Sequence, residues 1–76
     1  MALDYSSLLS DEQKRSILEQ RIAQFASEAY QHDINKTVAS ATGNEEGVTQ
    51  AEEALVILEG AISVHQDELA KLAPTE

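Results

Sequence analysis

The sequence predicts an all-α protein: an antiparallel hairpin of two long helices that pairs into a four-helix bundle or a larger helical assembly. Three observations support this prediction. The 76 residues include only three Gly, one Pro, two Tyr and one Phe, and they are rich in good helix formers. A segment without a helix breaker over 11–42 and a second helical segment over 45–72 flank a single turn at Gly43-Asn44. The second segment carries a heptad pattern of apolar residues.

We expect one helical-hairpin domain over residues 1–76. Its parts are a lead-in (1–10), a first helix (11–42), a turn (43–46), a second helix (45–72) and a tail (73–76). The lead-in is too apolar for a free tail. We therefore expect it to pack on the rest of the structure through Leu3, Tyr5, Leu8 and Leu9.

Capping signals place the start of the first helix. Ser10 and Gln13 fit a capping box, in which the Ser hydroxyl accepts a hydrogen bond from a first-turn amide and the Gln side chain reaches back. This box predicts a start near Asp11, although Ser6 or Ser7 could cap an earlier start. No helix breaker follows before the turn.

The turn lies where Gly43 and Asn44 interrupt the pattern. Gly43 suits the position just after a helix, and Asn44 can cap the helix that follows. A competing capping box at 49–52 would place the start of the second helix several residues later, so the sequence does not decide between the two starts. The second helix should end before Pro74. A connection this short makes the two helices antiparallel.

The second helix carries the strongest pattern in the chain. Eight residues at alternating spacings of three and four form a heptad seam that only a histidine interrupts. They are Val48, Ala51, Leu55, Leu58, Ile62, His65, Leu69 and Leu72. The apolar face is wider than one partner helix needs, because a further row extends it on one side. That row consists of Ala54, Ile57, Ala61 and Val64.

The first helix carries two apolar stripes at different heights. The first consists of Leu18, Ile22, Phe25 and Ala29, and its continuation is polar. The second consists of Tyr30, Ile34, Val38 and Ala41. The second stripe lies about 120° around the helix from the first. One partner helix cannot cover both stripes unless the first helix kinks or curves around it. Antiparallel pairing places Phe25 level with Ile62.

We interpret the surplus apolar surface as the contact with another subunit. A chain of this size without Cys has a small core and often depends on association for stability. The expected partner is another copy of the chain, with a different protein as a second possibility. The predicted interface consists of Tyr30, Ile34, Val38, Ile57 and Val64.

The chain is strongly acidic, with 14 Asp and Glu against 5 Lys and Arg and a formal net charge of −9. This balance argues against nucleic acid or an anionic membrane as the partner. An acidic surface is predicted at Glu45, Glu46, Glu52, Glu53 and Glu59. We interpret it either as a solvated face or as a docking surface that mimics a polyanion and blocks a host protein.

The few basic residues gather on one side of the first helix. Lys14, Arg21, His32 and Lys36 fall within about 60° of one another, with Glu28 between them. They could contact the acidic helix of another subunit, or phosphate. An RNA-binding regulator is therefore a further alternative, in which Lys14, Arg21 and Lys36 provide the affinity.

No motif indicates catalysis, a cofactor or a metal site. The sequence has no Gly-rich phosphate loop and no paired His-Glu metal motif, and no nucleophile, base and orienting group can be placed in one pocket. We expect a non-enzymatic protein without a cofactor. The longest apolar run, 54–58, is far shorter than the roughly 20 residues of a membrane span. No signal-peptide pattern is present, so we expect a cytoplasmic protein of a host cell or a virion-associated one.

Two resemblances follow from these features. The layout resembles the plasmid Rop family of dimeric helical hairpins, which bind paired RNA loops on one face of the bundle. No residue corresponds, so no Rop site is carried over. The segments LSDEQ (9–13), RIAQFA (21–26) and ATGNEE (41–46) are similar to small helical proteins of tailed bacteriophages. That resemblance implies a viral setting, and it implies no activity or site.

The sequence thus predicts a small non-enzymatic protein that self-associates and serves an interaction or structural role, and the second resemblance implies that it is phage-encoded. The first alternative is an acidic inhibitor of a host protein. The second is an RNA-binding regulator with a Rop-like layout.

Overall fold

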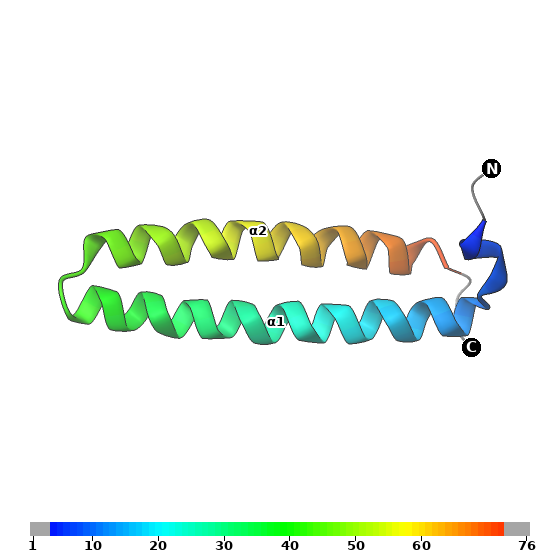
Figure 1. Cartoon of the computed structure of the whole chain (residues 1–76), viewed down its shortest axis with the longest axis horizontal. Helices are drawn as coiled ribbons and strands as arrows, with labels where there is room; N and C mark the ends of the chain where they lie inside the picture. Colours follow the sequence, from blue (N-terminus) through cyan, green and yellow to red (C-terminus); the bar gives the residue numbers. More distant parts are fainter. Residues whose placement is uncertain (1–3, 73–76) are drawn as a thin grey trace.

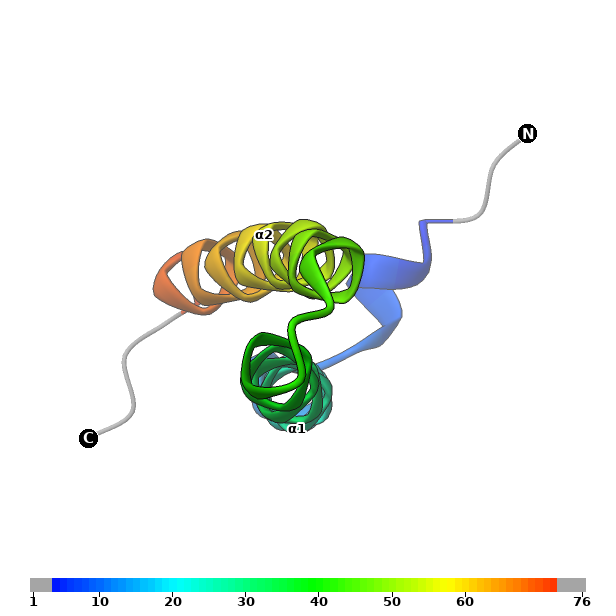
Figure 2. The same ribbon diagram turned by 90° about the vertical axis from the view of Figure 1, so that its left-hand side faces the viewer.

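The computed structural model describes residues 4–72 and shows two long helices packed side by side as a hairpin (Figure 1). A short 3-10 helix, η1 (Tyr5–Leu8), precedes α1 (Asp11–Ala41) and α2 (Glu45–Ala70). No strand occurs among the described residues. The predicted all-α hairpin is therefore confirmed. Viewed from the turn, α2 lies across α1 at an angle, and η1 lies to one side of the pair (Figure 2).

The start of α1 is the predicted capping box. The Ser10 hydroxyl accepts a hydrogen bond from the Gln13 amide at 3.1 Å, and the Gln13 side chain accepts one from the Ser10 amide at 2.8 Å. The acidic side chains of Asp11 and Glu12 occupy the first turn, where the helix dipole favours negative charge. The helix therefore begins at Asp11, and the earlier start at Ser6 or Ser7 is wrong.

A Schellman motif ends α1 and leads directly into α2. Gly43 has a φ of 74°, in the left-handed region that favours glycine. The amide of Asn44 donates to the carbonyl of Ala39 at 2.8 Å, and that of Gly43 donates to Ser40 at 3.3 Å. The Asn44 side chain then accepts from the Gly47 amide at 3.0 Å and caps α2. The competing start at 49–52 is therefore wrong.

The two helices meet along one continuous seam. Every residue of the heptad seam predicted on α2 is buried or half-buried. On α1 the half-buried row does not stop where the first apolar stripe ends, because His32 and Lys36 continue it to Ala39. Figure 1 shows α1 running without a kink, so the second apolar stripe does not turn toward α2.

The register agrees with the predicted pairing. Arg21 contacts His65, and Lys36 contacts Glu52, each within one residue of the partner that the antiparallel register predicts. Near the turn the helices approach closely through small residues. A Cβ on Gly47 would lie 3.0 Å from the Cβ of Ala39 and 2.7 Å from the amide nitrogen of the Asn44 side chain.

The core of the hairpin is very thin. Among the described residues only Ala39 and Ala51 are buried, with exposed fractions of 7% and 4%. No large side chain of residues 4–72 is fully buried. Nine large apolar side chains are exposed: Tyr5, Leu8, Ile17, Tyr30, Ile34, Val38, Val56, Ile57 and Val64.

The lead-in packs less than predicted. Leu9 is half-buried, but Tyr5 and Leu8 are 74% and 67% exposed, so the prediction that they pack is wrong for these two residues. The physical reason is that η1 lies beside the open end of the hairpin, where only two helix ends are available to cover it (Figure 2). Leu3 lies outside the described residues.

Two glycine substitutions should change stability in opposite directions. Gly43→Ala should lower the free energy of unfolding by about 1 kcal/mol, because alanine is strained at this positive φ. Gly60→Ala should raise it by about 0.5 to 1 kcal/mol, because Gly60 lies inside α2 and a Cβ there meets nothing within 4 Å. Urea denaturation followed by circular dichroism at one protein concentration measures both. Equal shifts of the two variants would contradict the left-handed turn.

Candidate interaction surface

The seam divides the hairpin into two long sides with different chemistry. Residues at seven-residue intervals lie on the same side of a helix that packs in heptads. On one side these rows are Lys14, Arg21, Glu28 and Asn35 of α1, and Gly47, Ala54, Ala61 and Glu68 of α2. On the other side they are Glu12, Glu19, Ala26, Asp33 and Ser40 of α1, and Glu45, Glu52, Glu59 and Gln66 of α2.

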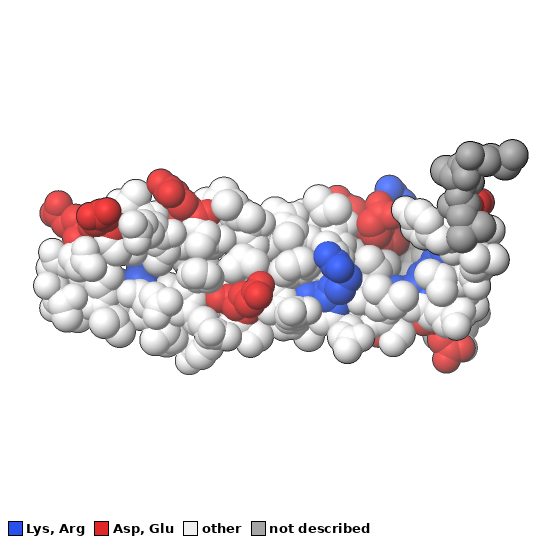
Figure 3. Space-filling view, viewed as in Figure 1, with Lys and Arg blue, Asp and Glu red and all other residues white. Residues whose placement is uncertain are grey.

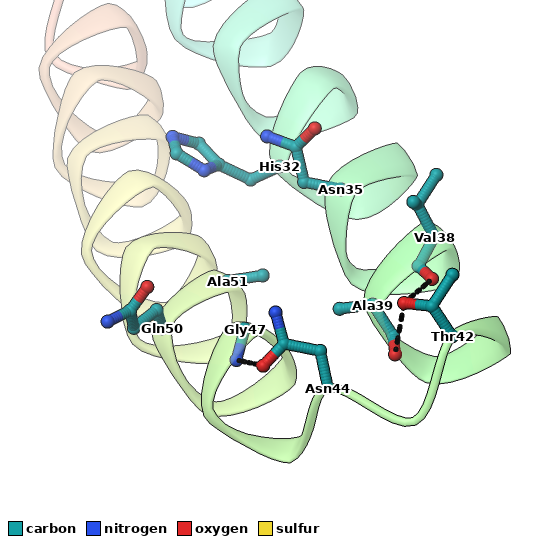
Figure 4. Close-up of a pocket in the computed structure, with 9 residues that line it drawn as sticks. All are labelled: His32, Asn35, Val38, Ala39, Thr42, Asn44, Gly47, Gln50 and Ala51. Carbon is teal, nitrogen blue, oxygen red and sulfur yellow. Dashed lines mark hydrogen bonds between the residues drawn. The ribbon is translucent and has the colours of Figure 1, made fainter.

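Two pockets lie on the first of these sides. One, of about 420 Å³, lies near the turn (Figure 4). Its lining includes Asn35 and Val38 of α1 and Gly47 and Gln50 of α2. In Figure 4 the methyl groups of Ala39 and Ala51 face each other across its floor, and the His32 ring points toward α2.

The second pocket, of about 220 Å³, lies at the open end of the hairpin. Ile17 and Leu18 of α1, Leu72 beyond α2, and Tyr5 of η1 contribute apolar lining, and Lys14 and Glu68 contribute charged lining. Gly47 at the first pocket and Glu68 at the second are three heptads apart, so both pockets open on the same side of the hairpin.

We call this side the apolar face and define it by six residues. They are Ile17 and Val38 of α1, and Ala54, Ile57, Ala61 and Val64 of α2. The two alanines are half-buried, whereas Ile57 and Val64 are 72% and 59% exposed. The four charged residues of its flanking rows are two basic and two acidic, so their charges cancel.

The five residues of the predicted interface do not share one face. All five are exposed, as a surface for a partner requires. Val38, Ile57 and Val64 belong to the apolar face. Tyr30 and Ile34 lie elsewhere on the outer surface of α1. Each step of four residues turns the side chain by about 40° around the helix, so the two point progressively further away from Val38.

Two large exposed apolar residues of the long helices α1 and α2 were missing from the predicted interface. Ile17 completes the apolar face at the open end, and its signal was its three-heptad spacing from Val38. Val56 is 69% exposed and follows the seam residue Leu55, so it points away from the apolar face. No sequence signal distinguishes Val56 from its apolar neighbours.

The opposite side carries the acidic surface. All five predicted residues of that surface are exposed. Glu45, Glu52 and Glu59 form one row on α2. Glu46 and Glu53 each follow a member of this row and point about 100° further around the helix, away from the seam. Lys36 reaches this side from the seam and pairs with Glu52 at 3.3 Å between Nζ and Oε2. Apart from this exposed pair, the row is a chain of carboxylates with little compensation.

The basic residues of α1 do not form a single patch. Lys14 and Arg21 lie on the apolar side, whereas Lys36 reaches toward Glu52 on the acidic side. Arg21 and Lys36 are both engaged within the hairpin, with His65 and Glu52 respectively. The predicted phosphate-binding row is therefore divided by the seam.

Arg21, Phe25 and His65 form the most specific side-chain cluster of the hairpin. Arg21 Nε donates to His65 Nε2 at 2.9 Å, and His65 Nδ1 lies 2.6 Å from the carbonyl oxygen of Ala61. A neutral ring with its proton on Nδ1 satisfies both contacts. The ring also meets Phe25 edge-on at 5.0 Å between centroids, and the Arg21 guanidinium lies 5.5 Å from the Phe25 centroid.

One lysine has a shifted pKa. Lys71 Nζ donates to Glu68 Oε2 at 2.7 Å at the end of α2. This hydrogen bond, together with the negative charge of Glu68, raises the pKa of Lys71 above its ordinary value. The pair is solvent-exposed, so it neutralises Glu68 at the end of the apolar side without adding much stability.

Within residues 4–72 no group of three or more His, Asp or Glu side chains is placed to hold a metal ion. None of the helices in that range is both long and apolar enough to cross a membrane. Comparisons with protein-family models, curated proteins and solved structures found no match for this chain.

The histidine cluster predicts a measurable loss on truncation. His65→Ala should lower the free energy of unfolding by about 1 to 2 kcal/mol, because it removes the acceptor of Arg21 and the edge contact with Phe25. Gln66→Ala, at the exposed neighbouring position, should change it by less than about 0.5 kcal/mol. Urea denaturation compares the two. A His65 variant as stable as the Gln66 variant would show that the cluster contributes nothing.

Proposed function

We propose that the protein is a small, non-enzymatic interaction or structural protein that works as a homo-oligomer assembled through its apolar face. The observation that carries this proposal is the thin core. A 76-residue chain without Cys that buries only two alanines among its described residues has little burial to offset the conformational entropy of folding. Covering Ile57 and Val64 against another copy would supply the missing burial.

The distribution of charge supports the apolar face as the surface of contact. Two copies that each carry a net charge of −9 repel one another unless their carboxylates are kept apart. The rows flanking the apolar face carry balanced charges, whereas the opposite side carries rows of Glu. Figure 3 shows one long face of the hairpin, on which acidic and basic side chains form separate groups with uncharged surface between them.

Charged substitutions on the apolar face should dissociate the oligomer. The double variant Ile57→Asp, Val64→Asp should sediment as an 8.3 kDa monomer at concentrations where the unmodified chain has at least twice that mass. Two buried, unpaired carboxylates per subunit cost far more than such an interface gains. Analytical ultracentrifugation measures the mass, and circular dichroism measures the helix content that remains.

Val56→Asp is the matched control. It introduces the same charge at an equally exposed valine of the same helix, but outside the apolar face. This variant should keep the mass of the unmodified chain. A fully helical monomer of the unmodified chain at high concentration would overturn the proposal, and dissociation by Val56→Asp would move the interface to another face.

The acidic side favours a second candidate function: docking onto a basic protein surface that otherwise binds a polyanion. Its support is the row of Glu45, Glu52 and Glu59 on α2, continued by Glu12, Glu19 and Asp33 on α1. Along this side the carboxylates repeat at helical spacing, as phosphates repeat along a nucleic-acid strand.

The second candidate predicts binding that depends on salt and on this row. The immobilised protein should capture a basic protein from a bacterial lysate at 50 mM salt and release it at 500 mM, because exposed charges are screened at high ionic strength. Replacing Glu45, Glu52 and Glu59 with Gln should abolish the capture. Replacing Glu28, Asp67 and Glu68 with Gln removes the same charge elsewhere and should not. An equal loss of capture in both variants would show that the binding depends on the net charge of the protein and not on this row of glutamates.

A further inference from the structure

We propose that two copies pair through the apolar face with their turns at opposite ends, related by a twofold axis perpendicular to the helices. This inference rests on the proposed self-association and specifies its geometry. It follows from the positions of the apolar residues along the two helices, which are symmetric about one common level.

The apolar residues of α2 are complementary to themselves. Ala54 and Val64 lie equally far from the level of Glu59, and so do Ile57 and Ala61. A twofold axis at this level places Ile57 opposite Ala61 of the second copy, and Ala54 opposite Val64 of the second copy. Each large side chain then meets a small one, which is the alternation that lets two helices approach and interdigitate.

The apolar residues of α1 specify the same level independently. Ile17 and Val38 lie symmetrically about the boundary between Ser27 and Glu28. The register set by the Arg21–His65 and Lys36–Glu52 contacts brings Glu28 level with Glu59 of α2. One axis therefore serves both helices, and it places Ile17 opposite Val38 of the second copy.

The other twofold arrangement, with both turns at the same end, fits the face poorly. An axis parallel to the helices brings α1 against α2 of the second copy at equal heights. Ile57 would then meet Gln31, and Val64 would meet Gln24, the residues that occupy the same row of α1 as Ile17 and Val38. Apolar side chains would cover polar amides along the middle of the interface, and Ile17 and Val38 would meet no apolar partner.

Glu28 lies close to the proposed axis and is the one flanking residue that opposes its own copy. It is exposed in the hairpin, and no other charged residue of the rows that flank the apolar face lies at this level. The two Glu28 carboxylates approach one another only when the turns lie at opposite ends. In the arrangement with both turns at the same end, the two copies of α1 lie diagonally across the four-helix bundle, so the two Glu28 carboxylates stay apart.

A distance between two turns tests the arrangement directly. The chain has no Cys, so Ser40→Cys, at an exposed position near the turn, provides a single site for a spin label. Pulsed dipolar spectroscopy should give a separation of about 35 to 45 Å, since Ser40 lies twelve residues from the axis level in each copy. The same-end arrangement predicts a separation below about 25 Å.

The outcomes separate this inference from the proposed function. A distance below about 25 Å would overturn the opposite-end arrangement while leaving self-association intact. No dipolar coupling together with a monomer mass would overturn self-association itself. Adding Ile57→Asp and Val64→Asp to the labelled chain should abolish the long distance, and its persistence would show that another face forms the contact.

Glu28→Gln provides a second readout. It should lower the dissociation constant of the dimer about two- to fivefold, because it removes one like-charge contact between exposed groups. Glu19→Gln is the matched control on the acidic side of the same helix and should leave the dissociation constant unchanged. Equal effects of both variants, or no effect of Glu28→Gln, would contradict the placement of Glu28 at the axis.

Discussion

The fold depends on a single contact, the seam between α1 and α2, which is one layer of side chains deep. In a pair of helices each helix shields only one side of the other. Leucines and isoleucines of the seam therefore stay half-buried, and among residues 4–72 only Ala39 and Ala51 are buried, near Gly47, where the helices approach closely. Half-buried side chains contribute less to stability than enclosed ones. The helix caps and the proposed contact with a second copy therefore account for a larger share of the stability of the hairpin.

The same seam also divides the surface of the hairpin into two sides of different chemistry. Once two helices pack through heptad positions, the positions flanking the seam face one of two opposite sides. The sequence places glutamates in the flanking rows of one side, and glycine, alanine and balanced charges in those of the other. Each residue contributes little alone, but together they make one side strongly acidic and leave the charges of the other balanced, and this second side is the one proposed to contact another copy. In the proposed self-association, the direction of contact follows from the periodicity of the two helices.

Sequence reasoning predicted those parts of the structure that depend on local chemistry and on period. The Ser10 capping box, the turn at Gly43 and the seam of α2 were all predicted, and all are local or periodic signals. It did not predict that His32 and Lys36 continue the seam of α1, because polar residues at seam positions look like the end of an apolar stripe. It also grouped Tyr30 and Ile34 of α1 with Ile57 of α2 in one interface. The sequence of each helix shows which of its own residues point outward, but only the packed pair shows which outward rows of α1 and α2 lie on the same side of the hairpin.

The polar residues of the seam have a role that a purely apolar seam could not fill. Heptad seams can slip by a whole repeat with little change in apolar contact, whereas a polar pair across the seam matches in only one register. Arg21 with His65 and Lys36 with Glu52 fix that register at two heights, one on each side of the hairpin. A slip of seven residues would move Ile17 and Val38 away from the level about which the apolar row of α2 is symmetric. The polar contacts inside the hairpin therefore support the register on which the proposed pairing with a second copy depends.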